Sequence, residues 1–290
     1  MSKKHYLLLL LITFLFGSAY PVQKLIFNQN VPPILMGSLR MFIVFICLIP
    51  FWKFKIPEKK YWLPLFFFSI CMGFMANLFM TLSLKEAAIV SPIIIGSQLA
   101  IPFAVLLSSF FLKEKVSLKK WFFIFTSFVG VSILSFDPLI KNEIFALFLI
   151  SFMAFFYASA QVFSRYLKEL DVTLTNCMMG LCGFFFLFIT SYIFEGDILN
   201  NLININFKSW LLISHSAIFV SIAAHMSMFY LYKIYPVNKV FPFYALFPIF
   251  GILQTMVIFN EIPTLIVFLG GFIVITSIYL LNRLDGGIIK

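Results

Sequence analysis

The sequence predicts an all-α integral membrane protein, with ten transmembrane helices in two inverted five-helix repeats around a central cavity. Of the 290 residues, 62% are hydrophobic and only 11% are charged, too few charges to cover a soluble protein of this size. Apolar runs of about twenty residues recur along the chain, which is the length that crosses about 30 Å of hydrocarbon. One unusual apolar segment occurs twice, which indicates an internal duplication.

The apolar runs predict helices because backbone in the bilayer core must be hydrogen-bonded within a helix or a closed barrel. They lack the strict two-residue alternation of a barrel strand. The connections between them are too short to hold a soluble domain. The expected spans are Tyr6 to Phe27, Pro33 to Trp52, Tyr61 to Leu84, Ile89 to Leu112, Leu118 to Phe136, Ile144 to Arg165, Thr173 to Phe194, Trp210 to Tyr232, Val240 to Phe259 and Leu265 to Asn282.

Lysine and arginine predict the orientation, since short cytoplasmic loops carry an excess of both. With the N-terminus inside, only four lysines fall on the outer side: Lys24, Lys85, Lys141 and Lys208. We expect both termini in the cytoplasm, an uncleaved first helix, and a multi-pass protein of the cytoplasmic (inner) membrane. The net charge of +10 is then a topology signal, and no nucleic-acid partner is expected. The partners we expect are a small-molecule substrate and the lipid bilayer.

The duplicated segment covers residues 89–115 and again residues 240–264. Both copies contain prolines within an apolar span and end abruptly in polar residues. A shift of 141 residues places Tyr20 on Gln161, and a shift of 148 places Asn77 on His225. We therefore expect a first repeat over residues 6–139 and a second over residues 143–282. Each has five spans, an odd number, so the second copy enters the membrane from the opposite side.

Inverted repeats give a molecule two nearly equivalent conformations, one open to each side of the membrane, with a shared site near mid-depth. This architecture is typical of secondary transporters. It is not exclusive to them, because some channels and membrane enzymes have inverted repeats as well.

Several short motifs, spread over nearly the whole chain, are individually loose and collectively specific. They are Phe16-Gly17-Ser18 with Lys24, Val31-Pro32-Pro33 with Arg40-Met41-Phe42, Ile101-Pro102-Phe103-Ala104 with Leu112-Lys113-Glu114 and Gly130-Val131, and Phe247-Pro248-Ile249-Phe250 with Glu261 and Gly270. Together they resemble the EamA family of the drug/metabolite transporter superfamily, most closely its amino-acid and metabolite exporters. The resemblance implies ten helices in two inverted bundles, with a cavity lined by spans one, three, four, six, eight and nine. The chain departs from the family pattern at Phe16, Phe123 and Ser277.

Two prolines are candidate helix breaks near mid-depth. A proline inside a helix frees the carbonyl four residues earlier, so Pro102 would free that of Gln98 and Pro248 that of Tyr244. Freed backbone is tolerated at depth only where it is buried in protein or lines a watery cavity. We expect Gln98 and Tyr244 to face the cavity. The alternative is a packing kink satisfied by a neighbouring helix.

The remaining substrate-binding candidates are polar or aromatic side chains near mid-span. Asn77 and His225 are costly in hydrocarbon without partners, so they should face the protein interior. His225 can also exchange a proton near neutral pH, whereas ordinary interhelical hydrogen bonding is the alternative. Tyr20, Tyr157 and Gln161 would supply aromatic walls with polar tips, which suit a small zwitterion; simple packing is the alternative for the tyrosines.

Three charged residues are assigned structural roles. Arg40 lies near the centre of a span, where insertion costs about 2.5 to 3.5 kcal/mol, so it should have a partner or reach water. We favour a structural role, as the family resemblance suggests, over binding a substrate carboxylate. Glu114 and Glu261 invite a proton-coupling role, but each precedes an expected helix N-cap, Ser117 or Thr264, and we interpret both as structural turn residues.

The function expected from this pattern is secondary transport, most simply the export of amino acids or related compounds by alternating access. Import of a nucleoside-like or methyl-donor metabolite is the alternative within transport. An intramembrane lipid or acyl transferase is the alternative from another class. No catalytic residues, cofactor or metal are expected, because the chain has neither a nucleotide-binding loop nor zinc-ligand spacing, and only three histidines.

Overall fold

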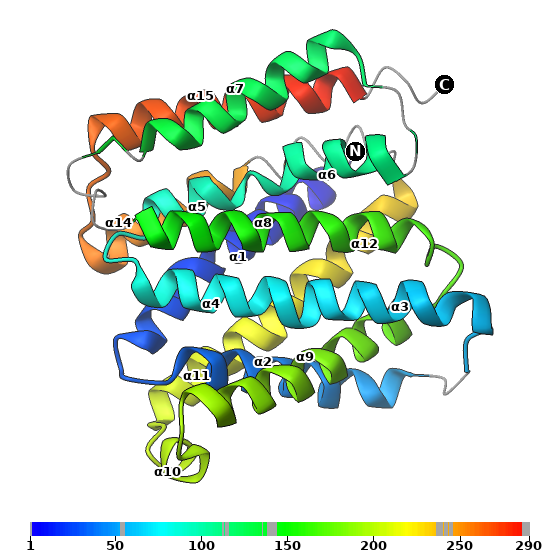
Figure 1. Ribbon diagram of the computed structural model, residues 1–290, viewed down its shortest axis with the longest axis vertical. Helices are drawn as coiled ribbons and strands as arrows, with labels where there is room; N and C mark the ends of the chain where they lie inside the picture. Colours follow the sequence, from blue (N-terminus) through cyan, green and yellow to red (C-terminus); the bar gives the residue numbers. More distant parts are fainter. Residues whose placement is uncertain are drawn as a thin grey trace.

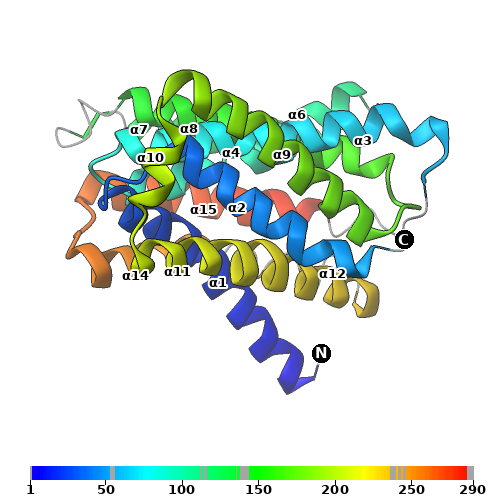
Figure 2. The ribbon, with the colours of Figure 1, turned by 90° about the horizontal axis from the view of Figure 1, so that it is seen from below.

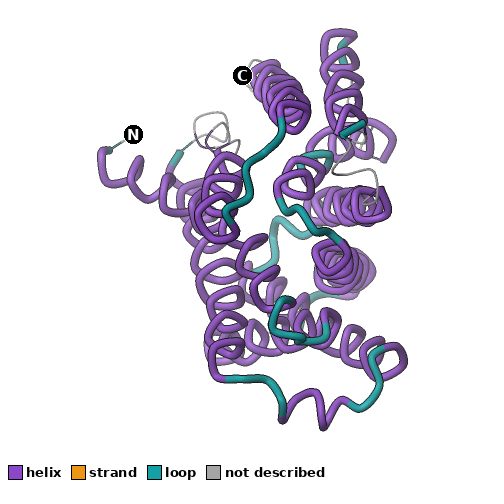
Figure 3. Tube along the Cα trace, turned by 90° about the vertical axis from the view of Figure 1, so that its left-hand side faces the viewer, coloured by secondary structure: helices purple, strands orange, loops and turns teal. Residues whose placement is uncertain are grey.

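The computed structural model describes residues 2–52, 56–111, 113, 116–134, 136–137, 144–235, 240, 243 and 246–285. Every regular element within these ranges is a helix, as the tube in Figure 3 shows. The first half contains α1 (Lys3–Phe27), α2 (Pro33–Leu48), η1 (Ile49–Phe51), η2 (Lys59–Tyr61), α3 (Trp62–Ser69), η3 (Ile70–Met75), α4 (Ala76–Glu86), α5 (Ser91–Ser97), α6 (Ala100–Phe111) and α7 (Leu118–Leu134). The all-helical prediction is therefore confirmed for the described residues.

The second half contains α8 (Ile144–Arg165), α9 (Val172–Phe194), α10 (Ile198–Ile203), α11 (Phe207–His215), η5 (Ser216–Ala224), α12 (His225–Ile234), α14 (Phe247–Phe259) and α15 (Leu265–Asp285). Seven helical segments of the described chain are long and apolar enough to cross a membrane, and Phe247–Phe259 and Leu265–Leu281 are shorter apolar helices. The count of ten transmembrane helices stays a prediction.

Large apolar side chains cover the outside of the bundle. Phe110, Phe125 and Phe268, on three different helices, are between 67% and 73% exposed. A soluble protein rarely leaves so much apolar surface in contact with water, whereas lipid tails solvate it without cost. Together with the long apolar helices, this surface makes the chain a multi-pass membrane protein.

Helices of the two halves pack against each other in matched pairs (Figures 1 and 2). The second helix of each half pairs with that of the other, α2 with α9, and the last helices pair as α7 with α15. The contact of α1 with α14 has its counterpart in α8 with α6, and that of α2 with η5 has its counterpart in α9 with η3. The start of α1 and the end of α15 lie at the same end of the bundle (Figure 1).

Glycines allow two of these pairs to approach closely. A Cβ atom on Gly73 would lie 2.3 Å from the carbonyl oxygen of Met179, where η3 meets α9. A Cβ atom on Gly17 would lie 2.7 Å from the amide nitrogen of Gly251, where α1 meets α14. Small residues at such positions let helix backbones pack directly in a membrane, where there is little hydrophobic drive for association.

Two π-helical segments, η3 and η5, interrupt the third helix of each half. A shift of 148 residues places η3, Ile70–Met75, on residues 218–223, inside η5. A π-helical turn leaves carbonyl groups without their ordinary partners and often marks a functional site. The sequence did not predict either segment, because no glycine or proline pattern indicates a π-helix there.

The prolines begin helices instead of interrupting them. Pro248 lies in the first turn of α14, which starts at Phe247, and Pro102 is the third residue of α6. A proline in the first turn removes no helical hydrogen bond. The expected release of the Gln98 carbonyl is wrong, because that oxygen accepts the amide hydrogen of Ile101 at 3.1 Å. The span does break, but at Gln98 and Leu99, before the proline.

Candidate functional site

Polar side chains from four helical segments meet at the centre of the bundle. Tyr20 on α1 and Arg40 on α2 are 6% and 9% exposed, and they interact electrostatically. Arg40 also interacts with His225, the first residue of α12. Ser221 on η5 binds Arg40 directly. Because the packing of α1, α2 and η5 buries these groups, the polar centre is closed to solvent in this conformation.

Arg40 is held by one hydrogen bond. Its Nε donates to the hydroxyl oxygen of Ser221 at 3.0 Å, and Ser221 donates its own proton to the carbonyl oxygen of Ser216 at 3.0 Å. That carbonyl belongs to the π-helical segment, so the irregular backbone provides the anchor. The Nη1 atom of Arg40 is buried and has no acceptor.

Tyr20 lies between aromatic and hydroxyl groups. Its ring stacks on that of Phe247, with centroids 6.2 Å apart and an interplanar angle of 8°. The hydroxyl of Ser97 donates to the carbonyl oxygen of Ile94 at 2.7 Å, and the same hydroxyl is hydrogen-bonded to the phenol of Tyr20. The phenol of Tyr157 on α8 is close enough to interact electrostatically with that of Tyr20. Two of the expected cavity residues, Tyr20 and Tyr157, therefore lie near each other.

His225 presents one nitrogen to the site. Its Nδ1 lies 3.1 Å from the carbonyl oxygen of Val220, which can only accept, so Nδ1 carries the proton. In the neutral ring Nε2 is then the acceptor. The ring of Phe16 packs edge-on against the imidazole, with centroids 4.7 Å apart. His225 thus joins the central group as a hydrogen-bond acceptor beside a cation and aromatic rings.

Asn77, which the expected repeat pairs with His225, forms hydrogen bonds to carbonyl groups of its own helix. Its Nδ2 donates to the carbonyl oxygens of Met72 at 2.8 Å and Gly73 at 3.1 Å, both in η3. His225 makes the matching bond five residues back. The side chain of Asn77 is 7% exposed, and its further polar contact is with the sulfur of Met41 at 3.9 Å. The π-helical carbonyls therefore take both donor hydrogens of the amide, and a substrate-facing role for Asn77 stays a prediction.

Of the other expected cavity residues, one is buried, one is exposed and one lies outside the described residues. Gln98 is 3% exposed, and its Nε2 is buried without a partner. Gln161 is exposed on α8, and its place in the cavity stays a prediction. Tyr244 and Glu114 lie outside the described residues.

Two glutamates bind helix N-termini across the two halves. Glu261, after α14, accepts the amide hydrogens of Val90 and Ser91, each at 2.9 Å, at the start of α5. Glu195, after α9, accepts those of Ile34 at 2.7 Å and Leu35 at 2.8 Å, at the start of α2. The positive end of a helix favours such anions. Sequence reasoning missed Glu195, because its partners are more than 150 residues away in the chain.

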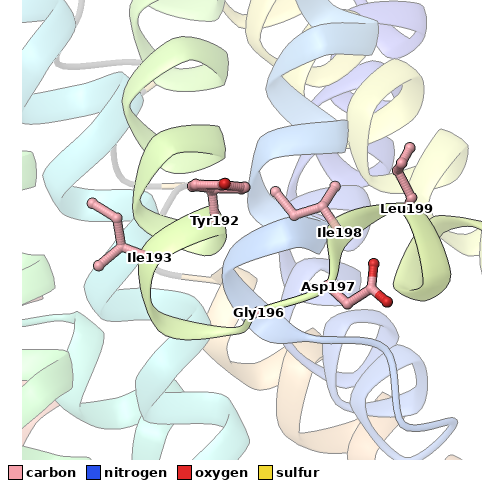
Figure 4. A pocket seen from close by; sticks show the side chains of 6 residues that line it. All are labelled: Tyr192, Ile193, Gly196, Asp197, Ile198 and Leu199. Atoms are coloured by element: carbon pink, nitrogen blue, oxygen red, sulfur yellow. The ribbon is translucent and has the colours of Figure 1, made fainter.

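A hollow on the molecular surface lies apart from this polar centre. Figure 4 shows it at the end of α9 and the start of α10, beside Tyr192, Asp197 and Leu199. None of the expected cavity residues lines it. Within the described residues no group of three or more His, Cys, Asp or Glu side chains could hold a metal ion.

The fold and the centre define a class: a multi-pass helical membrane protein whose two halves pack in matched pairs and contribute buried polar groups to a common site. Within this class the family is specific. The EamA-like transporter family matches residues 3–136 and residues 144–283, so the chain belongs to that family, and the resemblance found in the sequence is confirmed. The protein is accordingly a membrane transporter of small metabolites.

A solved structure described as "Crystal structure of protein" is similar over 100% of both chains, with a TM-score of 0.64 and 16% identity. That likeness supports the fold alone. No curated protein matches the chain.

Proposed function

We propose that the protein is a secondary transporter of the cytoplasmic membrane that exports amino acids or related zwitterionic metabolites by alternating access. The observation that carries this proposal is the buried polar centre shared by α1, α2, α8, η5 and α12. A cation, a neutral imidazole acceptor and aromatic rings meet there, and these are the groups that suit a small molecule of mixed character.

Ten helices in two inverted repeats form part of the proposal. The matched helix pairs and the two equivalent π-helical segments support it, since exchange of the halves leaves the pattern of contacts largely unchanged. Such a pair of repeats can rock about a fixed central site. The excess of Lys and Arg in alternate loops supports cytoplasmic termini.

Counterflow in proteoliposomes tests the function. Purified protein is reconstituted with unlabelled amino acids inside, and uptake of labelled amino acids, nucleosides and S-adenosylmethionine is compared. We expect accumulation of amino acids and not of the others. Accumulation of nucleosides or the methyl donor alone would replace the proposed substrate class, and no counterflow of any compound would overturn transport.

Two variants test the place of the site. His225→Ala and Gln98→Ala should each lower the initial counterflow rate at least about tenfold, because each removes a polar group from a water-free site. Ser132→Ala is the control, since Ser132 is exposed on α7 and binds only its own helix through Phe128. All three should insert equally, as measured by membrane yield. Wild-type rates in both site variants would show that the substrate binds elsewhere.

A further inference from the structure

Arg40 brings a positive charge to the centre of the bundle without a matching negative charge. It lies in the middle of α2, and it forms no ion pair with a described residue. The described acidic side chains all lie in loops or at helix ends: Glu58, Glu86, Asp137, Glu169, Asp171, Glu195, Asp197 and Glu261. Within the part of the chain that the structure describes, no acidic side chain compensates the charge of Arg40.

Most of the hydrogen-bond donors of Arg40 also have no acceptor among the described residues. A guanidinium has five N–H donors and no acceptor, and among the described residues only Ser221 takes one of them. The buried Nη1 has two hydrogens, and no described residue accepts either of them. Buried polar groups are nearly always paired, and ionisable residues at membrane depth usually mark a substrate or ion path. A purely structural arginine would use its free donors on carbonyl groups of neighbouring helices.

We propose that Arg40 is the carboxylate-binding residue of the transport site and that substrates are selected for a free carboxylate. The inference rests on the proposed function and adds the recognised group. The planar fork of a guanidinium fits a carboxylate with two parallel hydrogen bonds. Ser221 accepts from Nε, and the buried Nη1 has no partner among the described residues, so Nη1 is available to a ligand.

The neighbours of Arg40 provide groups that can bind the ammonium group of an amino acid. The unprotonated Nε2 of His225 accepts a hydrogen bond from an ammonium group. The aromatic rings of Phe16, against His225, and Tyr20, beside Arg40, lie in the same centre, and aromatic rings attract cations. The site therefore separates a donor for the carboxylate from acceptors for the amine. This reverses the structural role that the sequence favours for Arg40.

Binding to purified protein in detergent tests the inference with compounds that differ in one group. The first series is L-phenylalanine, L-phenylalaninamide, 3-phenylpropionate and 2-phenylethylamine. The second is L-leucine, L-leucinamide, 4-methylpentanoate and 3-methylbutylamine. Dissociation constants come from tryptophan fluorescence. We expect the amino acid of at least one series to bind at least about tenfold more tightly than its amide, since the charge-assisted pair is lost with the carboxylate.

Variants assign that preference to Arg40. Arg40→Gln should reduce the ratio of amide to acid dissociation constants to about one, and Arg40→Lys should restore part of it by restoring charge. Arg283→Gln, the same change at an exposed position at the end of α15, should leave the ratio unchanged. A ratio within one variant does not depend on how much of the protein folds. A structural arginine would alter yield or stability but not this ratio.

The inference and the proposed function fail separately. Amides that bind as tightly as acids, acids that bind Arg40→Gln as they bind the wild type, or no binding of any acid would each overturn the role of Arg40. Acids that bind through Arg40 but show no counterflow would uphold the carboxylate site and overturn transport. Counterflow of amino acids that persists with an unchanged acid preference in Arg40→Gln would uphold transport and overturn the inference.

Discussion

Replacing Glu195 should destabilise the packing of the two halves more than replacing an exposed acidic residue does. Its carboxylate accepts three hydrogen bonds: from the amides of Ile34 at 2.7 Å and Leu35 at 2.8 Å, and from the hydroxyl of Ser191 at 2.7 Å. The residue belongs to the second half and the helix it caps, α2, to the first. Pro33 begins this helix, and Pro32 at its N-cap forms no side-chain hydrogen bond. Glu195 therefore caps the N-terminus of α2 in place of a local side chain.

The expected cost follows from these contacts. A hydrogen bond to a charged group contributes about 1.5 to 3 kcal/mol, and loss of a helix N-cap costs about 0.5 to 2 kcal/mol. The bonds of Glu195 share one carboxylate that is partly exposed, so their contributions do not add. We expect Glu195→Ala to lower the free energy of unfolding by about 2 to 3 kcal/mol. Glu195→Gln keeps an acceptor oxygen and loses the charge, and should cost about 1 kcal/mol.

The assay is unfolding by sodium dodecyl sulfate in mixed micelles, followed by the fluorescence of the four tryptophans. Glu58→Gln is the matched control, because Glu58 is 73% exposed and pairs with Lys60 at 3.0 Å on the surface. An exposed pair of this kind contributes about 0 to 1 kcal/mol. If Glu195→Gln and Glu195→Ala cost no more than the control, the carboxylate does not stabilise α2 and the reasoning is refuted.

Two further changes are measured in the same titration. Gly73→Ala should lower the free energy of unfolding by about 2 kcal/mol, the scale of overpacking, because the new Cβ atom would lie 2.3 Å from the Met179 carbonyl oxygen. Gly37→Ala is the control, because its Cβ atom would meet side-chain atoms at 3.4 Å. Equal losses of stability in the two variants would contradict the close approach of η3 and α9. Lys24→Met should cost about 1 to 2 kcal/mol, because Nζ donates to the carbonyl oxygens of Leu84, at 3.1 Å, and Ala87 at the end of α4. Exposed Lys208 supplies the control Lys208→Met, and a loss no larger than in that variant would show that Lys24 does not cap α4.

Much of the fold could be predicted because lipid leaves the chain few choices. Apolar runs of span length must be helical in hydrocarbon, and this holds whatever the neighbours are. The helix caps Ser117 and Thr264 could also be predicted, since they depend on adjacent residues. Thr264 accepts the amide hydrogen of Val267 at 3.2 Å, and Ser117 that of Lys120 at 3.4 Å. Patterns within one turn are local, and local patterns can be found in a single sequence.

The partners of the glutamates could not be predicted. The sequence places Glu261 at a turn, but nothing in its neighbourhood points to the amides of Val90 and Ser91. Backbone amides carry no residue-specific signal, so a carboxylate that binds them has no matching residue elsewhere in the chain. The same reason hides Glu195, which stands beside a glycine and an aspartate and resembles an ordinary loop residue.

The π-helical segments explain why repeat-equivalent residues have unlike surroundings. Asn77 and His225, which the proposed repeat pairs with each other, both bond the carbonyl five residues back. An amide has two hydrogens on one nitrogen, and η3 takes both, whereas an imidazole bound through Nδ1 still has Nε2 on its other side. In η5 a further carbonyl, that of Ser216, holds Ser221, and Ser221 holds Arg40. The same backbone irregularity therefore takes the donor hydrogens of both side chains, and of the two segments only η5 also holds Arg40 through Ser221, which supports our proposal that substrate binds on the η5 side of the centre.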